Sequence, residues 1–409
     1  MKILFINLPY YGHVMPTIGL VQELIKRGCE VTYLLPYDWE STIAESGATF
    51  YGYQNHKKLS EQIKNAYATA DSIIESFDFV IYEQFFFLGK HIAEKHSKPV
   101  ARIFTAPVTN KLLMNEFITA KGPLSIFKHK WITKSFTKSI AKNIPLKTDN
   151  WLDEIIYNPP QLNLAYTLRQ YQPYSENFNE EQFKFLGPSI YKRKSEDFDF
   201  IKGEKPVIYI SLGTVVKGAV AFFQKCIEAF RDEPVDVIIS VGKNFDTKKL
   251  KNVPHNIHIY NSVPQLEVLK TSDVFVTHGG MNSVSEALVY GVPMVVIPFT
   301  ADQPVNARCV EKLGVGKHLP YSAINYDTLK ECVCSVMIDA GIKENIVKVQ
   351  ELIKQAPGNA GGAEMIIKYY KGLGLKLIHK IFSNCVLRLS DKLNYWRQWI
   401  WQKKMIGVC

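Results

Sequence analysis

The chain has 409 residues and lacks most patterns that mark membrane, disulfide-bonded or metal-centred proteins. It contains no apolar run of the roughly 20 residues that a membrane-spanning helix needs. The apolar segment from Ile3 to Leu8 is too short for a secretory signal peptide. The seven cysteines are scattered without C-x-x-C spacing, which predicts neither a disulfide framework nor a zinc site. We therefore expect a cytoplasmic protein with reduced thiols.

Two common nucleotide-binding motifs are also missing. None of the predicted strands is followed by G-x-G-x-x-G, which disfavours a nicotinamide dehydrogenase, and no Gly-Lys pair precedes Ser or Thr as a P-loop requires. The segment Asp197-Phe198-Asp199 superficially matches a D-x-D metal motif, but it lies in a charged run flanked by lysines rather than at a strand end. The sequence therefore predicts no metal and no cofactor.

The composition is that of a globular protein with room for two cores, since 46% of residues are hydrophobic and 22% are charged. In both halves, short β-branched or aromatic runs alternate with helical stretches, which predicts parallel sheets wound by helices. The predicted strands are Ile3 to Leu8, Val31 to Leu35, Phe79 to Tyr82, Val100 to Phe104, Val207 to Ser211, Val235 to Val241, Ile257 to Tyr260, Val274 to Thr277 and Met294 to Ile297.

The charged run 191–206 has too few apolar residues to be buried, so we predict that it is a linker. It separates a first domain, 1–190, from a second domain, 207–370, and residues 371–409 form a tail. A ligand site is then expected in a cleft between the two domains.

The most informative motif follows the predicted strand from Val274 to Thr277. His278-Gly279-Gly280 breaks that strand where small residues let the backbone approach a ligand, and a helix begins at about Asn282. The exposed amides and positive end of that helix favour an anion such as phosphate, to which His278 adds a donor. Asn282 and Ser283 also have the side chains of helix caps, and Glu286 could be a solvated helix residue.

A second candidate lies near the N-terminus, where Gly12-His13 follows the first predicted strand. Ligands of open α/β sheets bind at the carboxyl ends of strands, so a titratable imidazole in that turn is a candidate general base. Taken alone, a histidine in this position is more often an ordinary loop histidine than a catalytic one.

Both motifs resemble those of the UDP-glycosyltransferase family, in particular its bacterial macrolide-type members. The resemblance rests on GHVMPTIGLVQELIKRGCEVTYL at the start and on VPQ, THGGMNS, EAL, GVPMVVIPF and DQ further on, and it extends over about residues 1 to 370. It implies an α/β protein of the GT-B fold, in which two Rossmann-like domains with parallel sheets face each other across a cleft.

The resemblance also assigns roles at the first motif. His13 would remove the proton of an acceptor hydroxyl, and the position of the family's orienting aspartate is occupied here by Glu83. A glutamate is longer, so the geometry must adjust; otherwise Glu83 is a strand-end surface residue, and Asp78 is the second candidate.

The donor would be held by the second domain. The family's small-residue phosphate loop corresponds to Ser211, Gly213 and Thr214, and Asp302 and Gln303 resemble the pair that reads donor-sugar hydroxyls. Gln265 and the main chain near Val263 would contact the uracil base, and Glu286 would accept hydrogen bonds from the ribose hydroxyls. Ser262 occupies the position where many relatives carry an aromatic ring that stacks on the base. A UDP-sugar is the expected donor, and a dTDP-sugar is the second candidate. The full predicted donor set is Ser211, Gly213, Thr214, Val263, Gln265, His278, Gly279, Gly280, Asn282, Ser283, Glu286, Asp302 and Gln303.

The activity implied is an inverting, metal-independent transfer of a hexose, with glucose the commonest, from a UDP-sugar to a hydroxyl of a hydrophobic lipid or natural product. Two alternatives remain. One is a soluble glycosyltransferase that inactivates antibiotics or natural products, and the other is an inactive relative that only binds a nucleotide sugar.

Two basic segments are relevant to where in the cell the protein is located. Residues 371–409 carry eight Lys or Arg against the single acid Asp391, with apolar residues at helical spacing and three tryptophans, as expected of a basic amphipathic helical tail. Residues 121–147 carry seven lysines and no acid. Segments 375–409 and 121–147 could therefore meet an anionic membrane at the inner face of the cell, or the tail could pack on the protein. No nucleic-acid module is recognisable, so nucleic acid is not an expected partner.

Overall fold

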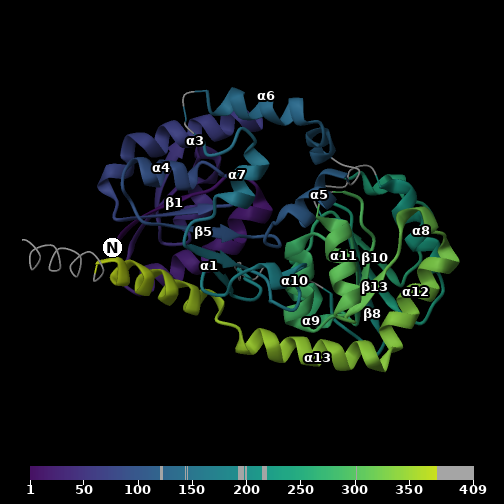
Figure 1. Cartoon of the computed structure of the whole chain (residues 1–409). Helices are drawn as coiled ribbons and strands as arrows, with labels where there is room; N and C mark the ends of the chain where they lie inside the picture. The colour runs from purple at the N-terminus through teal and green to yellow at the C-terminus, as the bar shows by residue number, and fades with distance from the viewer. Residues whose placement is uncertain are drawn as a thin grey trace, which may run out of the picture. The chain divides into compact units, whose positions relative to one another are not determined.

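The computed structural model describes residues 1–409 apart from 120–122, 143, 145, 192–197, 199, 214–218, 301 and 375–409. It contains two parallel β-sheets (Figure 1). Both sheets belong to one compact unit, Met1–Gly362, and the remaining residues, Ala363–Cys409, form a second unit that begins with helical residues 363–374. The second unit thus begins at Ala363, and the predicted tail begins at residue 371.

Within the described residues, the first sheet has seven strands in the order β3-β2-β1-β4-β5-β6-β7. All its neighbours pair in parallel. Strands such as β4 and β5 are buried along their whole length, as expected for a sheet covered on both faces. The strands are β1 (Lys2–Ile6), β2 (Glu30–Pro36), β3 (Thr49–Tyr53), β4 (Phe79–Glu83), β5 (Val100–Phe104), β6 (Leu162–Ala165) and β7 (Phe183–Phe185).

The second sheet has six strands in the described part of the chain, in the order β10-β9-β8-β11-β12-β13, again all parallel. Its core also takes in Leu168 and Tyr171, which lie before the predicted linker. The strands are β8 (Val207–Ser211), β9 (Asp236–Ser240), β10 (Ile257–Tyr260), β11 (Val274–Thr277), β12 (Met294–Val296) and β13 (Gly316–His318).

Helices connect the strands of both sheets, as right-handed parallel connections require. The first group is α1 (Tyr11–Lys26), α2 (Glu40–Ala44), α3 (Leu59–Ile73), α4 (Gly89–Lys95), α5 (Lys111–Thr119), α6 (Lys130–Ile140) and α7 (Trp151–Tyr157). The second is α8 (Val220–Ala229), α9 (Gln265–Thr271), α10 (Met281–Tyr290), α11 (Gln303–Lys312), α12 (Tyr326–Ile338) and α13 (Ala340–Gln355).

Each sheet reverses its winding direction at one pair of strands. In the first sheet the reversal lies between β1 and β4, and in the second between β8 and β11. Connections leave these neighbouring strands toward opposite sides, and α/β proteins bind ligands at the carboxyl ends of such strands. His13 follows β1, Glu83 ends β4, Ser211 ends β8 and His278 follows β11, so the predicted residues occupy both reversal points.

All nine predicted strands are present, and β3, β6, β7 and β13 are additional. The prediction that 191–206 is too polar to pack was partly wrong. Phe198 lies 5.3 Å from Tyr260 and Phe200 lies 5.2 Å from His258, measured between ring centroids, so these two phenylalanines cover the edge strand β10. Asp197 and Asp199 lie outside the described residues.

The helices in the described part of the chain include none that is long and apolar enough to cross a membrane. The predicted amphipathic stripe of 375–409 lies outside the described residues.

Candidate active site

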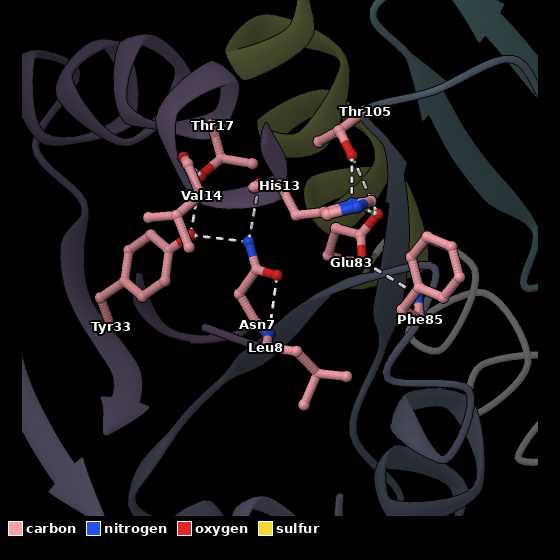
Figure 2. Close-up of polar contacts among 9 residues, drawn as sticks. All are labelled: Asn7, Leu8, His13, Val14, Thr17, Tyr33, Glu83, Phe85 and Thr105. Carbon is pink, nitrogen blue, oxygen red and sulfur yellow. Dashed lines mark hydrogen bonds and ion pairs between the residues drawn. The ribbon is translucent and has the colours of Figure 1, made fainter. Parts of the chain in front are cut away.

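His13 is the third residue of α1, directly above the carboxyl end of β1 (Figure 2). Its Nδ1 lies 3.0 Å from Oε1 of Glu83 and 2.8 Å from Oγ1 of Thr105. Glu83 is the last residue of β4, and its other oxygen, Oε2, accepts a hydrogen bond of 2.9 Å from the amide of Phe85. With Nδ1 engaged, Nε2 is the ring atom left to exchange a proton with a bound hydroxyl.

The predicted partnership of His13 with Glu83 is therefore present in the structure, and the alternative reading of Glu83 as a surface residue is wrong, because its side chain is 0% exposed. Asp78, the second candidate, lies at the opposite end of β4. Its Oδ2 accepts a hydrogen bond from the backbone amide of Lys2, far along the strand from His13.

The charges around His13 favour its protonated form. Burial lowers the pKa of His13, but attraction to Glu83, the hydrogen bond to Glu83 and attraction to Asp302 together outweigh burial. The pKa therefore lies above the ordinary imidazole value. An imidazole whose basicity is raised in this way accepts a proton more readily, as a general base must.

Hydrogen bonds also hold the backbone of His13 in place (Figure 2). The buried amide of Asn7 donates a hydrogen bond of 2.9 Å to the carbonyl oxygen of His13 and one of 3.0 Å to the hydroxyl of Tyr33. That hydroxyl also lies 2.7 Å from Oγ1 of Thr17, one turn further along α1. The network fixes the first turn of α1 on the sheet.

Aromatic side chains surround the imidazole. The rings of Phe85 and Tyr10 meet it edge to face, with centroids 4.8 Å and 5.9 Å away. Tyr11 and Trp39 form a neighbouring pair with centroids 6.5 Å apart, and Tyr10 and Tyr11 are both partly exposed. Accessible rings of this kind favour an apolar or aromatic partner near His13.

At the second reversal point, two glycine turns enclose His278. Gly213 has φ +64°, and a Cβ built on it would lie 2.5 Å from Cε1 of His278; a Cβ on Gly280 would lie 2.5 Å from Nε2 of the same ring. Gly279 has φ +83° and would clash with Val296. The turns after β8 and β11 are thus brought together, and only glycine fits these positions. Ser211 is buried beside them, and Thr214 lies outside the described residues.

His278 is neutral at physiological pH, because burial lowers its pKa to about 4. In the described part of the structure its Nδ1 is buried without a hydrogen-bond partner. Leaving such a group unpaired costs about 1–3 kcal/mol, so an incoming polar ligand that reaches it gains that amount.

The helix α10 begins one residue earlier than predicted, at Met281, with Gly280 as its N-cap. Asn282 and Ser283 lie inside the helix rather than at its N-cap, so the alternative reading of these two residues as caps is wrong. The backbone amide of Met281, the first of the helix, hydrogen-bonds the carboxyl group of Asp302. The following amides of the first turn are the kind of group that binds an anion at a helix start. A Cβ built on Gly12 would lie 3.9 Å from Nδ2 of Asn282, so this helix start faces the turn that carries His13.

The two residues assigned to the nucleoside lie together. Nε2 of Gln265 donates hydrogen bonds of 2.5 Å to Oε2 of Glu286 and 3.3 Å to Oγ of Ser283. The hydroxyl of buried Tyr209 donates to Oε1 of Gln265 over 3.1 Å, which orients the amide. Val263 packs against the second core, and Ser262 is exposed.

Asp302 and Gln303 lie at the start of α11 and have different partners. Burial raises the pKa of the Asp302 carboxyl group. Hydrogen bonds from its own amide, from Asn306 and from the amide of Met281, together with attraction to His13, oppose this rise. Oε1 of Gln303 accepts from the amides of Phe299 and Thr300 over 2.8 Å and 3.0 Å, so only its amide nitrogen is left to meet a sugar.

Several residues of this arrangement were missed by sequence reasoning. The buried amide of Asn306 donates to Oδ2 of Asp302 over 2.9 Å and to the carbonyl of Gly279 over 2.8 Å, and its oxygen accepts from the hydroxyl of Tyr171 over 2.9 Å. Asn7 and Thr105 were missed as well. Their position just after β1 and β5 was the available signal, since that edge of the sheet carries the site.

Comparison with known proteins places these features in context. A family described as "UDP-glucoronosyl and UDP-glucosyl transferase" matches residues 190–360. The "NDP-glycosyltransferase YjiC" of Bacillus licheniformis is 32% identical and aligns with 90% of this chain and 98% of its own length. The oleandomycin glycosyltransferase of Streptomyces antibioticus is 24% identical over 87% of this chain and 88% of its own.

Solved structures give the same result for the fold. A glycosyltransferase of kitacinnamycin superposes with a TM-score of 0.77 at 25% identity, covering 90% of this chain and 98% of the other. The calicheamicin glycosyltransferase CalG4 superposes with a TM-score of 0.75 at 25% identity, covering 91% and 98%.

Proposed function

Because this chain belongs to the UDP-glucoronosyl and UDP-glucosyl transferase family, we propose that it moves a hexose, preferentially glucose, from a UDP-sugar to a hydroxyl of a hydrophobic acceptor. Membership makes it an enzyme of the GT-B fold that transfers a sugar from a nucleotide-sugar donor to an acceptor. The hexose, the uracil base, the acceptor and the stereochemistry are proposed from the site.

The observation that carries the mechanism is the 3.0 Å contact between Nδ1 of His13 and Glu83 at the reversal point of the first sheet. In the proposed reaction, Nε2 of His13 removes the acceptor proton while the acceptor oxygen attacks the anomeric carbon. The bond to the diphosphate breaks on the opposite face, so the configuration inverts. Glu83 stabilises the imidazolium that forms.

The departing diphosphate would be received by the second sheet. The start of α10 and the glycine turns at Gly213 and Gly280 offer backbone amides, and His278 offers one uncharged donor. These groups stabilise negative charge without a divalent cation. Gln265 and Glu286 would bind the nucleoside, and Asp302 with the amide nitrogen of Gln303 would bind the sugar.

The proposed acceptor is a lipid or a natural product with an apolar or aromatic body. Its support is the two rings that contact His13, Phe85 and Tyr10, together with the partly exposed Tyr11, which pairs with Trp39. The oleandomycin and calicheamicin glycosyltransferases act, by their names, on natural products, which favours the same class here. An antibiotic or other natural product inactivated by glycosylation is the narrower alternative.

Release of free UDP from UDP-glucose tests the proposal. We expect release by the purified protein with dissolved phenolic or macrolide aglycones or with lipid extract, undiminished by a chelator. Loss of activity in chelator would contradict metal independence, and release from dTDP-glucose alone would contradict the uracil assignment. Binding of UDP-glucose without turnover on any acceptor would favour an inactive relative.

A second proposal concerns location: the enzyme works in the cytosol at the inner, anionic face of a membrane. The specific observation is the outer face of α6, where Trp131 is 72% exposed next to the exposed lysines Lys130, Lys134 and Lys138. Lys134 pairs with Asp149, which leaves the other two for lipid headgroups. Each lysine near an anionic surface adds about 1 kcal/mol of attraction.

We expect the full chain to sediment with vesicles rich in anionic lipid, and Trp131→Ala combined with Lys130→Gln and Lys138→Gln to weaken that binding at least about tenfold. Ile338→Ala is the matched control, because Ile338 is 74% exposed on α12. A chain shortened by residues 375–409 that still sediments would show that the tail is not the anchor. Equal binding to neutral and anionic vesicles would contradict the proposal.

A further inference from the structure

Thr105 follows β5 and lies between the two residues proposed to exchange and stabilise the proton. Its hydroxyl is 2.8 Å from Nδ1 of His13 and 3.0 Å from Oε1 of Glu83, and its side chain is only 3% exposed (Figure 2). These three atoms are within hydrogen-bond distance of one another. No charge or motif marks Thr105 in the sequence.

Counting protons assigns the direction of each hydrogen bond. A threonine hydroxyl has one proton to donate and can accept as well, whereas an ionised carboxylate only accepts. The hydroxyl therefore donates to Oε1 of Glu83 and accepts from the Nδ1–H of His13. The Nδ1–H is shared with Oε1 of Glu83, which is 3.0 Å away. This pattern is satisfied only when the proton of neutral His13 is on Nδ1.

These hydrogen bonds also compensate for the greater flexibility of a glutamate, rather than an aspartate, at position 83. A glutamate has one more rotatable bond than an aspartate, so its carboxylate is held less firmly by its own backbone. Here both oxygens are fixed, Oε2 by the amide of Phe85 and Oε1 by the hydroxyl of Thr105. Threonine suits this task because its β-branched side chain has few rotamers.

We propose that Thr105 is a positioning residue of the transfer reaction, which holds Glu83 in place and keeps the proton of His13 on Nδ1 so that Nε2 is free to act as the base. This inference rests on the proposed role of His13. Thr105 acts through His13 and Glu83, and its expected effect is on the rate of the chemical step rather than on donor binding.

The hydroxyl also moderates the charge that His13 experiences. The titratable groups around His13 are Glu83 at the end of β4, Asp302 at the start of α11 and Tyr10 before α1. A hydroxyl that donates to Glu83 offsets part of its negative charge. Without it, Glu83 attracts the imidazolium more strongly, so the pKa of His13 rises further and the base is neutral only at higher pH.

The experiment compares Thr105→Val, which keeps the shape and removes the hydroxyl, with Thr105→Ser, which keeps the hydroxyl. Thr133→Val is the matched control, because Thr133 is equally buried and its hydroxyl donates to the carbonyl of Phe127, away from the site. All are assayed for kcat, KM and pH dependence on a dissolved acceptor, and folding is checked by circular dichroism. Thr105→Ala replaces the valine variant if that variant does not fold.

We expect Thr105→Val to lower kcat by about 10- to 100-fold with donor KM changed less than about twofold, and to move the acid limb of the pH profile upward. Thr105→Ser should stay within about threefold of wild type, as should Thr133→Val. A Thr105→Val enzyme with the kcat and pH profile of Thr133→Val, while His13→Ala is inactive, would overturn the inference. Full activity in His13→Ala would instead overturn the proposed base itself.

Discussion

His13→Ala is expected to lower kcat by about 10²- to 10⁴-fold, because it removes the group proposed to take the acceptor proton. Donor binding should be almost unchanged, since the donor is assigned to the second sheet. The measurement is UDP release under saturating UDP-glucose, alongside calorimetric binding of UDP to the same variant. A variant that binds UDP normally and turns over at the wild-type rate would contradict the assignment of His13 as base.

The pH profile adds a second check on the same residue. A base must be neutral to act, so the rate should fall as pH drops through the pKa of His13, which lies above the ordinary value of 6.5. Glu83→Gln removes the main attraction that raises this pKa and should move the acid limb to lower pH, with a loss of about 10- to 1,000-fold in kcat. His278 should contribute no limb near neutrality, because its pKa is about 4.

Gly213→Ala is expected to weaken UDP binding by at least about tenfold. An alanine at φ +64° costs about 1–2 kcal/mol in backbone strain, and its Cβ would lie 2.5 Å from Cε1 of His278. The ring must therefore move away from the position proposed to receive the diphosphate. Calorimetry with UDP measures the effect without any acceptor.

Gly358→Ala separates the effect of backbone strain from the effect of displacing the His278 ring. Gly358 has φ +60° with nothing within 4 Å of a built Cβ, so it suffers similar strain without displacing a neighbour. We expect this control to lose stability and to keep its affinity for UDP. If Gly213→Ala bound UDP as tightly as Gly358→Ala, the turn after β8 would not be part of the donor site.

The interior of the fold could be predicted because its strands are buried and apolar on both faces. The missed strands β3, β7 and β13 are edge strands with mixed sequences, TFYGY, FKF and GKH. An edge strand needs fewer apolar residues because one side lacks a neighbour, so composition alone does not reveal it. The fourth, β6, is only four residues long.

The site was predictable where chemistry and position coincide. His278 stands directly after β11, Glu83 ends β4, and His13 lies in the first turn of the helix that follows β1, so titratable side chains mark the two reversal points. The contact of Glu83 with His13 required the pairing of β1 with β4, which no local pattern contains. Thr105 and Asn306 are uncharged and common in turns and helices, and their partners come from distant segments. Only the folded chain shows that these partners meet.

The hydrogen bond from Tyr171 to Asn306 has a consequence for recombining this enzyme with its relatives. Tyr171 and Leu168 belong by sequence to the first half but pack in the core beneath the second sheet. A chimera joined at residue 190 would give Asn306, and through it Asp302, a foreign partner. A junction placed before Leu168 would keep Tyr171 and Asn306 in one segment with Asp302, the residue proposed to bind the donor sugar. Under the proposed donor assignment, the segment that must be exchanged to transfer donor preference therefore starts upstream of the point where the second sheet begins.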